Sequence, residues 1–243
     1  MFVRADLHIH TVLSPCAEVE MIPPLIVERA LEARLDLIAI TDHNASANAQ
    51  AVIAAAQDTG LKVLPGMELQ TREEVHLLCL FDSMDQVEAW QKEIDRLLPE
   101  QENRAETLGE QFVVDAAGDF VRREERLLLV SADISLEDAA DRVARLGGLA
   151  IPAHIDRPAF GLIGQLGLVP DKFKRGILEI SPLISEEVAR RRFSLPDQVG
   201  LIRSSDAHWL AAIGSGATEV NLEGARNLAN LTRALHAARV RLS

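Results

Sequence analysis

Two histidines, His8 and His10, occupy alternate positions in the apolar stretch ADLHIHT at residues 5–11. Side chains of a strand repeat every second residue, so both imidazoles point to the same side if this stretch is extended. A His-x-His pair at the end of a strand can place two imidazoles on one metal ion. Two histidines on a solvated strand end are the alternative, and the positions of the other histidines decide between the two.

The chain has seven histidines, and six of them lie within or at the ends of short apolar runs, beside small or acidic residues. These six are His8, His10, His43, His76, His154 and His208. The seventh, His236, lies on a late helical stretch and is typical of a surface histidine. Packing alone does not explain six histidines in such places, so the pattern indicates a shared polar site.

The motifs around these histidines resemble those of the polymerase and histidinol phosphatase (PHP) family of metal-dependent phosphoesterases. They occur in the family's order across most of the chain, as His8-x-His10, Thr41-Asp42-His43, Gly66-Met67-Glu68, His76, Ala153-His154 and Ser205-Asp206-Ala207-His208. The resemblance implies an α/β fold, a distorted TIM-like (β/α)7 barrel. It also implies two or three divalent metal ions, for which zinc, manganese and iron suit His, Glu and Asp ligands.

The resemblance further implies how the ligands are shared. One ion would be held by His8, His10, Glu68 and Asp206. Glu68 would bridge to a second ion, completed by His76 and His154, and a third would be served by His43 and His208. A bridging carboxylate suits ions about 3.5–4 Å apart, which clamp the attacking and leaving oxygens of a displacement and activate a water.

One position departs from the family pattern. Members of the family often place a His or Asp in the loop after His-x-His, as a ligand of the third metal, and here the loop holds Ser14-Pro15-Cys16. Cys16 could replace that ligand as a thiolate, which would favour zinc or iron over magnesium. The alternative is a small loop residue with no metal contact. The departure concerns the third site and leaves the first two unaffected.

Three residues are candidates for catalytic roles beside the ligands: Asp42, Arg157 and His208. Asp42 is expected to orient a neighbouring histidine, since ligating histidines usually donate their other ring proton to an acceptor. The alternative for Asp42 is a plain turn residue. Arg157 could grip a substrate phosphate with two parallel hydrogen bonds, or it could be an ordinary surface arginine.

Strands and helices alternate along the chain. After the N-terminal strand, strands are predicted at residues 37–40, 61–68, 75–81, 149–154, 177–180, 201–206 and 218–221. Helices are predicted at residues 25–35, 46–59 and 84–98, from Asp133 or Ser135 to Gly147, and at residues 186–192 and 223–238. This alternation predicts βαβ units and a parallel sheet.

Most candidate ligands follow the carboxyl ends of different strands, where barrel enzymes place their chemistry. Ligands drawn from five or six strands favour a closed ring over an open doubly wound sheet, which offers a crevice at one switch point. His76, near the start of its predicted strand, does not fit this arrangement. The chain is expected to be a single domain over residues 1–243, and its charged segment at 99–131 an insertion or cap, partly helical.

The net charge of −12 argues against a broad basic surface for duplex nucleic acid. The expected partner is therefore a small phosphorylated substrate, such as a nucleotide or a short oligonucleotide. No apolar run approaches the roughly 20 residues that span a bilayer, and the N-terminus lacks the pattern of a signal peptide. With two cysteines and no disulfide framework, a cytoplasmic protein without a membrane partner is expected. The oligomeric state stays open.

The sequence thus favours a phosphoesterase that uses a metal-activated water. Two alternatives belong to other classes: a regulatory or accessory metal-binding module with little turnover, and a metal-assisted amidohydrolase. Binding of phosphate compounds without hydrolysis would favour the module. Release of ammonia or a carboxylate without phosphate would favour the amidohydrolase.

Overall fold

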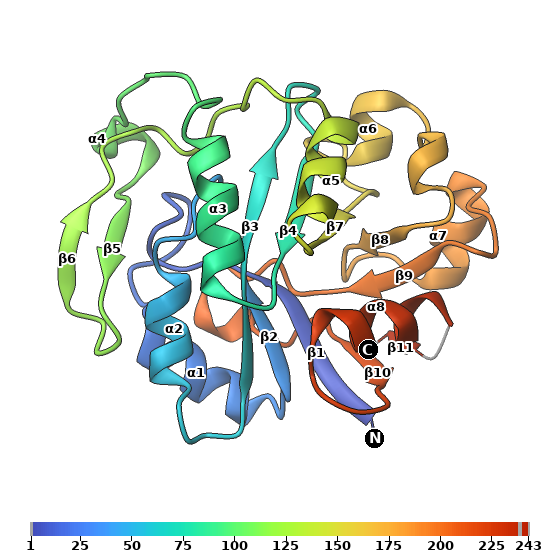
Figure 1. Ribbon diagram of the computed structural model, residues 1–243, viewed down its shortest axis with the longest axis horizontal. Coiled ribbons are helices and arrows are strands. Elements are labelled where there is room, and N and C mark those ends of the chain that lie inside the picture. The colour runs from blue at the N-terminus through green and yellow to red at the C-terminus, as the bar shows by residue number, and fades with distance from the viewer. Residues whose placement is uncertain (1, 238–239, 243) are drawn as a thin grey trace.

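The computed structural model describes residues 2–237 and 240–242, and within them the chain has an α/β fold (Figure 1). The strands are β1 (Phe2–Ile9), β2 (Leu37–Ile40), β3 (Lys62–Gln70), β4 (His76–Leu80), β5 (Phe112–Val114), β6 (Phe120–Arg123), β7 (Leu149–Pro152), β8 (Ile177–Ile180), β9 (Gly200–Arg203), β10 (Thr218–Asn221) and β11 (Val240–Leu242). The helices are α1 (Pro23–Glu32), α2 (Ala49–Ala55), α3 (Met84–Ile94), α4 (Ala105–Leu108), α5 (Leu136–Arg145), α6 (Leu162–Leu166), α7 (Glu186–Phe193) and α8 (Leu228–His236). The predicted α/β class is confirmed.

Seven strands form one curled sheet in the order β11-β10-β1-β2-β3-β4-β7. Strands β1, β2 and β3 are parallel, as the helices between them predict. Strands β8 and β9 form a separate parallel pair, and β5 and β6 form a hairpin.

The prediction of a parallel sheet is wrong for β4, which runs antiparallel to both β3 and β7. The loop between β3 and β4 is too short for a parallel crossover, which needs a dozen or more residues, so the chain turns back as a hairpin. The reversal brings the start of β4 beside the end of β3, where His76 pairs with Gln70. His76 therefore reaches the same edge as the ligands at the carboxyl ends of the parallel strands.

A closed form of the predicted distorted (β/α)7 barrel is not shown: in the part of the chain that the structure describes, the curled sheet is a half-barrel with the β8–β9 pair as a separate sheet. The backbone N–H of Ile155, after β7, donates to the carbonyl of Glu179 in β8 at 2.9 Å. Ala207, after β9, forms a parallel bridge with Ile9 at the end of β1. These links draw the two edges together, but among the described residues no continuous ladder joins β7 to β8 or β9 to β1.

Both faces of the central strands are buried, as the continuous apolar run of β2 predicts. Leu37 and Ala39 belong to a cluster that also takes side chains from β7, β8 and β9. Ile38 and Ile40 face the other way and pack with side chains of α1 and α2. Each fully buried Leu or Ile contributes roughly 1.5–3 kcal/mol to folding, so the strand ends that carry the polar residues are held by packing on both sides.

Helix α5 shows how local sequence places an element against the sheet. Of the two predicted capping residues, Ser135 is the one that caps, since its side chain accepts a hydrogen bond from the N–H of Asp138 at 3.2 Å. The apolar side of α5 then packs with Trp90 of α3 in a third core cluster. Both helices lie over the sheet near β3 and β4 (Figure 1).

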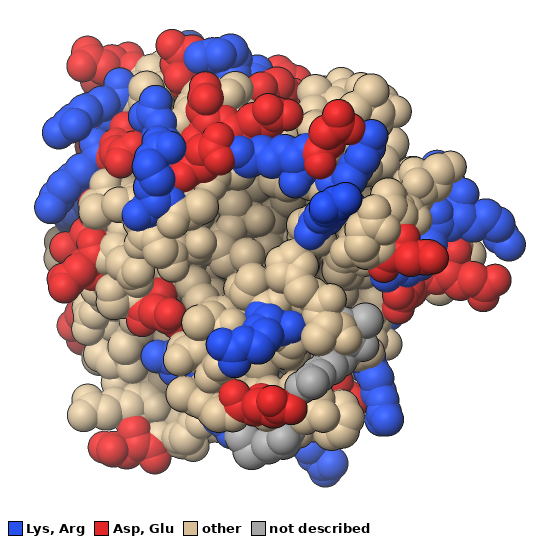
Figure 2. All heavy atoms as spheres, turned by 45° about the vertical axis from the view of Figure 1, so that its right-hand side comes forward, with Lys and Arg blue, Asp and Glu red and all other residues tan. Residues whose placement is uncertain are grey.

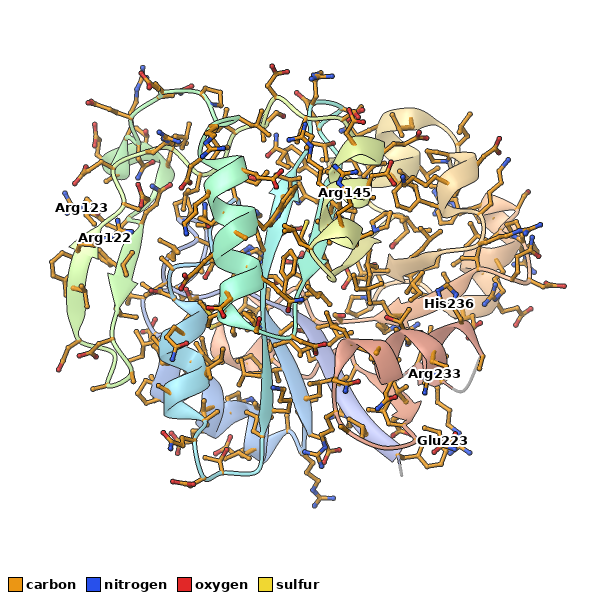
Figure 3. The ribbon with its side chains drawn as sticks, viewed as in Figure 1. Arg122, Arg123, Arg145, Glu223, Arg233 and His236 are labelled. Carbon is orange, nitrogen blue, oxygen red and sulfur yellow. The ribbon has the colours of Figure 1, made fainter. Side chains whose placement is uncertain are left out.

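The segment at 99–131 contains the short helix α4 and the β5–β6 hairpin, which the sequence does not predict. The hairpin stands at one side of the molecule (Figure 1), with Arg122 and Arg123 on its outer strand (Figure 3). Its inner strand is tied to the loop after β1, since the N–H of Phe112 donates to the carbonyl of Val12 at 3.1 Å. The segment is therefore attached next to the ends of the sheet that hold the histidines.

The last predicted helix, residues 223–238, is shorter in the structure. Helix α8 begins after Asn227, whose side chain accepts from the N–H of Asn230 at 3.0 Å, and the predicted end at Ala238 lies outside the described residues. His236 is exposed on α8, as expected of a surface histidine (Figure 3). None of the helices within the described ranges is long and apolar enough to cross a membrane.

Candidate metal centre

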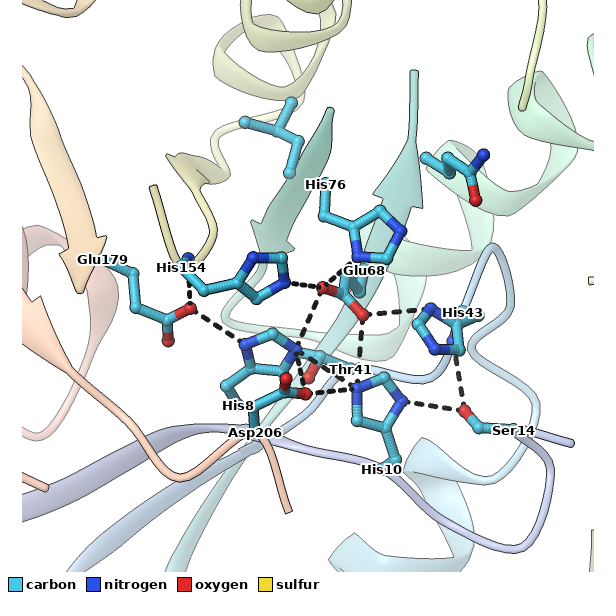
Figure 4. Close-up of polar contacts among 12 residues, drawn as sticks. His8, His10, Ser14, Thr41, His43, Glu68, His76, His154, Glu179 and Asp206 are labelled. Atoms are coloured by element: carbon cyan, nitrogen blue, oxygen red, sulfur yellow. Dashed lines mark hydrogen bonds and ion pairs between the residues drawn. The ribbon is translucent and has the colours of Figure 1, made fainter. Parts of the chain in front are cut away.

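The side chain of Glu68, on β3, lies at the centre of a cluster of histidines (Figure 4). Its Oε1 is 3.2 Å from His8 Nε2, 2.8 Å from His76 Nδ1 and 3.1 Å from His154 Nε2. Its Oε2 is 3.2 Å from His10 Nε2 and 3.0 Å from His43 Nδ1. A carboxylate with nitrogen donors on both oxygens has the arrangement that a bridging ligand requires.

Ligand atoms of four residues, His8, His10, Glu68 and Asp206, lie close together between β1, β3 and the loop after β9. Both His8 Nε2 and His10 Nε2 lie 3.2 Å from Asp206 Oδ1, and the two ring nitrogens are themselves 3.2 Å apart. Ligand atoms about 2.0–2.1 Å from one tetrahedral ion lie about 3.3 Å from each other. The spacing of these atoms and of Glu68 therefore fits a single cation, and this is the first ligand group that the resemblance implies.

The partner of His8 fixes which ring nitrogen carries its proton. Glu179 Oε2 lies 3.0 Å from His8 Nδ1 and also accepts the backbone N–H of His154 at 2.9 Å. A carboxylate only accepts, so His8 must be protonated at Nδ1 to donate. The lone pair at His8 Nε2 is then free to face the other ligand atoms.

A chain of hydrogen bonds through a hydroxyl group fixes the protonated ring nitrogen of His10 as well. Ser14 Oγ donates to Asp42 Oδ1 at 2.7 Å, and its oxygen accepts from His10 Nδ1 at 2.9 Å. Asp42 is held in turn by the N–H and hydroxyl of Thr11, at 2.7 and 2.8 Å. Asp42 is thus linked to His10 through Ser14 and not by direct contact, and its role in orienting that histidine stays a prediction.

These tautomers leave two imidazole lone pairs and two carboxylate oxygens converging in a buried space, which is repulsive without a positive charge between them. Two of the buried oxygens, Glu68 Oε2 and Asp206 Oδ1, face imidazole nitrogens of His8, His10 and His43 at 3.0 to 3.2 Å. Nitrogen and oxygen donors of this kind suit zinc, manganese or iron. The residues present therefore fit a divalent metal ion.

In the metal-free protein, bound protons supply part of the positive charge between these ligand atoms. Burial disfavours a charged His10, but hydrogen bonds to Asp206 and Glu68 outweigh it and raise its pKa to about 9. Burial would raise the pKa of Glu68, yet its electrostatic interactions with His76, His8 and His43 hold it well below the usual range. The metal-free centre at neutral pH therefore holds an ionised Glu68 and a protonated His10.

Metal binding at pH 7 should release protons, because ligation requires the neutral imidazole of His10. We expect the calorimetric enthalpy of zinc or manganese binding to differ between two buffers of unlike ionisation enthalpy, and the difference to shrink as the pH rises through about 9. The stabilising contribution of protonated His10 to the metal-free fold is complete below its ordinary pKa of about 6.5 and is lost over the same rise. Binding enthalpies that are equal in both buffers at pH 7 would contradict this assignment.

The other two predicted ligand groups are present in modified form. Glu68 and His76 form a cluster with His43. His154 Nε2 contacts Glu68 Oε1, the oxygen that His76 also contacts. His10, His43 and His208 form the third cluster. Burial lowers the pKa of His43 to about 4, and burial with nearby His10 lowers that of His208 to about 3. Both rings are therefore neutral at pH 7 and ready to act as ligands.

Two of the candidate ligands have strained backbones. His154 has φ of 28° and Asp206 has φ of 51°, values that residues other than glycine rarely adopt. Asp6, buried on β1, accepts the N–H groups of Ser205 and Gly214 at 3.0 and 2.9 Å and so fixes the loop that carries Asp206. Strain of this kind persists only where the surrounding structure enforces it.

A cavity of about 330 Å³ opens onto the histidines and is lined by Cys16, Arg157 and His208 among others. The Arg157 guanidinium pairs with Asp206 while its side chain stays 40% exposed. Cys16 is exposed and gives no atom to the three clusters found among the described residues. The thiolate ligand therefore stays a prediction.

A larger cavity of about 580 Å³ lies between α2, α3 and the segment after β6. It is lined by none of the predicted site residues, so the smaller cavity is the candidate site.

Sequence reasoning missed Glu179, Ser14 and Asp6. Glu179 stands in the apolar strand β8, where it is 1% exposed. A lone carboxylate in a buried strand costs free energy unless it is paired. Its place in an apolar run therefore indicates a buried partner for Glu179. Ser14 offers no such signal, since serine is common in loops.

The family of the chain follows from its sequence motifs together with this geometry. The sequence model of the PHP domain matches residues 6–146, which is more than half of the chain. The chain belongs to the PHP family. A second model, described as PHP-associated, matches residues 201–240, the part of this PHP protein that contains Asp206 and His208. The sequence has no match among curated proteins.

Solved structures share the PHP fold of this chain at low sequence identity. The lesion-specific endonuclease Q of Pyrococcus furiosus matches with a TM-score of 0.73 and 18% identity, over 100% of this chain and 58% of its own. A candidate metal-dependent phosphoesterase from Bifidobacterium adolescentis matches with 0.55 and 22%, over 84% and 87%. An amidohydrolase from Chromobacterium violaceum matches with 0.56 and 20%, over 98% and 97%. This chain thus spans little more than half the length of endonuclease Q.

The prediction that duplex nucleic acid is excluded and that the partner is a small molecule is wrong. Endonuclease Q, in a second structure that matches with a TM-score of 0.72 and 18% identity, holds a 27-mer duplex substrate with an abasic lesion at the active site. Net charge is a poor guide, because bound cations dominate the field at such a site. On the face shown in Figure 2, cationic and anionic side chains are interspersed, so the overall charge of −12 does not describe the local surface.

Proposed function

We propose that this PHP protein is a metal-dependent phosphoesterase with two or three divalent ions, of zinc, manganese or iron, held around Glu68. The observation that carries the proposal is the contact of Glu68 Oε1 and Oε2 with five histidines, at 2.8 to 3.2 Å. Ions that share a carboxylate polarise a phosphoryl group and supply an activated water. We include nucleic acid among the proposed substrates because the fold is similar to that of endonuclease Q, which holds a duplex substrate.

The chain's own residues bind and orient the reactants. Glu179 and the Ser14–Asp42 pair hold the protons of His8 and His10 at Nδ1, which leaves both Nε2 atoms as ligands. Arg157 lies in the cavity wall with its side chain 40% exposed, so it is positioned to donate two N–H groups to the oxygens of a phosphate. His208, neutral at pH 7, can serve as a ligand or accept a proton at the cavity mouth.

The proposal is tested by assaying phosphate release from an aryl phosphate and cleavage of an oligonucleotide. Manganese or zinc should support activity, a chelator should abolish it, and either metal should restore it. Binding of phosphate compounds without turnover by metal-loaded protein would support an accessory module instead. Active protein that lacks metal by elemental analysis would overturn the proposal.

A second candidate, metal-assisted hydrolysis of a C–N bond, is favoured by the likeness to the amidohydrolase, which covers nearly all of both chains. It predicts that amide substrates yield ammonia, an amine or a free carboxylate, and that phosphate esters yield no phosphate. Measuring both kinds of product on one metal-loaded preparation separates the two functions.

A further inference from the structure

The loop that follows β7 brings three different side chains to one wall of the cavity: His154, Arg157 and Phe160. The loop is firmly held. The N–H of Arg157 donates to the carbonyl of His154, and the N–H of His76 donates to the carbonyl of Phe160, both at 2.9 Å. The second of these bonds fixes the loop to the start of β4.

The backbone at Phe160 is strained, with φ of 59°. Bulky residues rarely adopt this conformation. Gly161 follows it, and a β-carbon there would lie 2.3 Å from the carbonyl oxygen of Arg157, so the chain can make this turn only with glycine. The fold thus places an aromatic side chain at the cavity through a conformation that it would otherwise avoid.

The ring of Phe160 stacks on the imidazole of His76, with centroids 4.6 Å apart and planes 11° from parallel. The residue is nevertheless 37% exposed, so part of it faces the cavity. Holding His76 does not require this exposed surface, because Glu68 already fixes the imidazole through Nδ1 at 2.8 Å. An exposed phenyl ring beside a metal centre offers a flat apolar surface to a bound molecule.

We propose that Phe160 stacks against a planar aromatic group carried by the substrate next to the phosphate that is hydrolysed. This rests on the proposed phosphoesterase function. The guanidinium of Arg157, three residues earlier, would hold the phosphate while Phe160 holds the ring. Nucleobases are the planar groups most often joined to phosphate esters, and base stacking on aromatic side chains tolerates any base sequence. The substrate class is therefore a nucleotide unit, alone or within a nucleic acid.

The test compares substrates that differ only in the base. One pair is a 5′-mononucleotide and ribose 5-phosphate, and the other is a dinucleotide with and without its bases. For each pair we measure kcat/KM of the substrate with the base and divide it by kcat/KM of the substrate without the base. Phe160→Leu should lower this ratio about tenfold, which corresponds to about 1.4 kcal/mol and lies within the range for one stacked base. Phe160→Tyr, which keeps the ring, should restore it.

Phe120→Leu is the matched control, since Phe120 is an exposed phenylalanine on β6 that does not line this cavity. It should leave the ratio unchanged. Metal content is measured on every variant. The same ratio of kcat/KM is measured for phenyl phosphate against cyclohexyl phosphate, in the parent protein and in Phe160→Leu. A fall in this ratio indicates stacking on a ring bonded directly to the phosphate, and a fall for the nucleotide pairs alone indicates a base carried by a sugar.

An unchanged ratio in Phe160→Leu would overturn the inference. So would an equal loss on both members of a pair together with loss of metal, because Phe160 would then serve only to hold His76. If the parent protein hydrolyses neither member of any pair but releases phosphate from an aryl phosphate, the inference fails and the proposed function stands. If it hydrolyses no phosphate ester at all, the proposed function itself fails.

Discussion

Glu68→Gln should lose both metal occupancy and turnover, with activity falling by at least about 10²-fold, the scale of losing a major electrostatic contribution. The substitution keeps the volume and removes the negative charge that separates the cations. Five histidine nitrogens lie within 3.2 Å of this carboxylate, so the substitution removes the negative charge that all five share. The measurement is metal stoichiometry and turnover on the same preparation.

Folding should survive this change, because the apolar clusters that hold β3 lie to either side of Glu68 and do not include it. Glu88→Gln is the control, since the same chemical change occurs at an exposed position on α3. If Glu68 were only an ion-pair partner, metal content would stay complete and turnover near normal. That result would exclude the bridging role.

Glu179→Gln should weaken metal binding by about 10- to 100-fold, the usual cost of removing the acceptor behind a ligating histidine. Glu179 accepts from His8 Nδ1 at 3.0 Å and so makes Nε2 more basic. A glutamine oxygen can still accept this bond, but it lacks the charge. Metal affinity is measured by titration of the metal-free protein, with turnover at saturating metal as a second reading.

Metal affinity, read together with stability, distinguishes this positioning role from a merely structural one. Burial disfavours a charged His8, but the charges of Asp206, Glu68 and Glu179 raise its pKa well above the ordinary value, so Glu179 and His8 form a buried ion pair in the metal-free protein. The midpoint of thermal unfolding of metal-free Glu179→Gln should therefore be lower, and metal affinity should fall with it. A lower midpoint with unaltered metal affinity would show that Glu179 only supports the fold. Glu187→Gln, exposed on α7, is the control.

Much of the candidate site can be predicted from the sequence because its residues follow local rules. The alternation of His8 and His10 places both rings on one side of β1, and the structure brings both to the same cation position. Glu68 is the last residue of the predicted strand 61–68, and His43 follows the apolar run of β2. The first ligand group and its shared carboxylate are thus implied by motifs, each of which extends over only a few residues.

The sequence by itself determined the α/β class, most strand positions and the types of ligand, because these depend on residues close together in the chain. Tertiary structure decided the rest. The short loop after β3 turns β4 back, but the pairing of β4 between β3 and β7 is what brings His76 to the site. Glu179 acts through a contact 171 residues away, with His8. Only packing of distant strands sets such contacts, since a carboxylate in a buried strand can be paired by any element that the fold brings beside it.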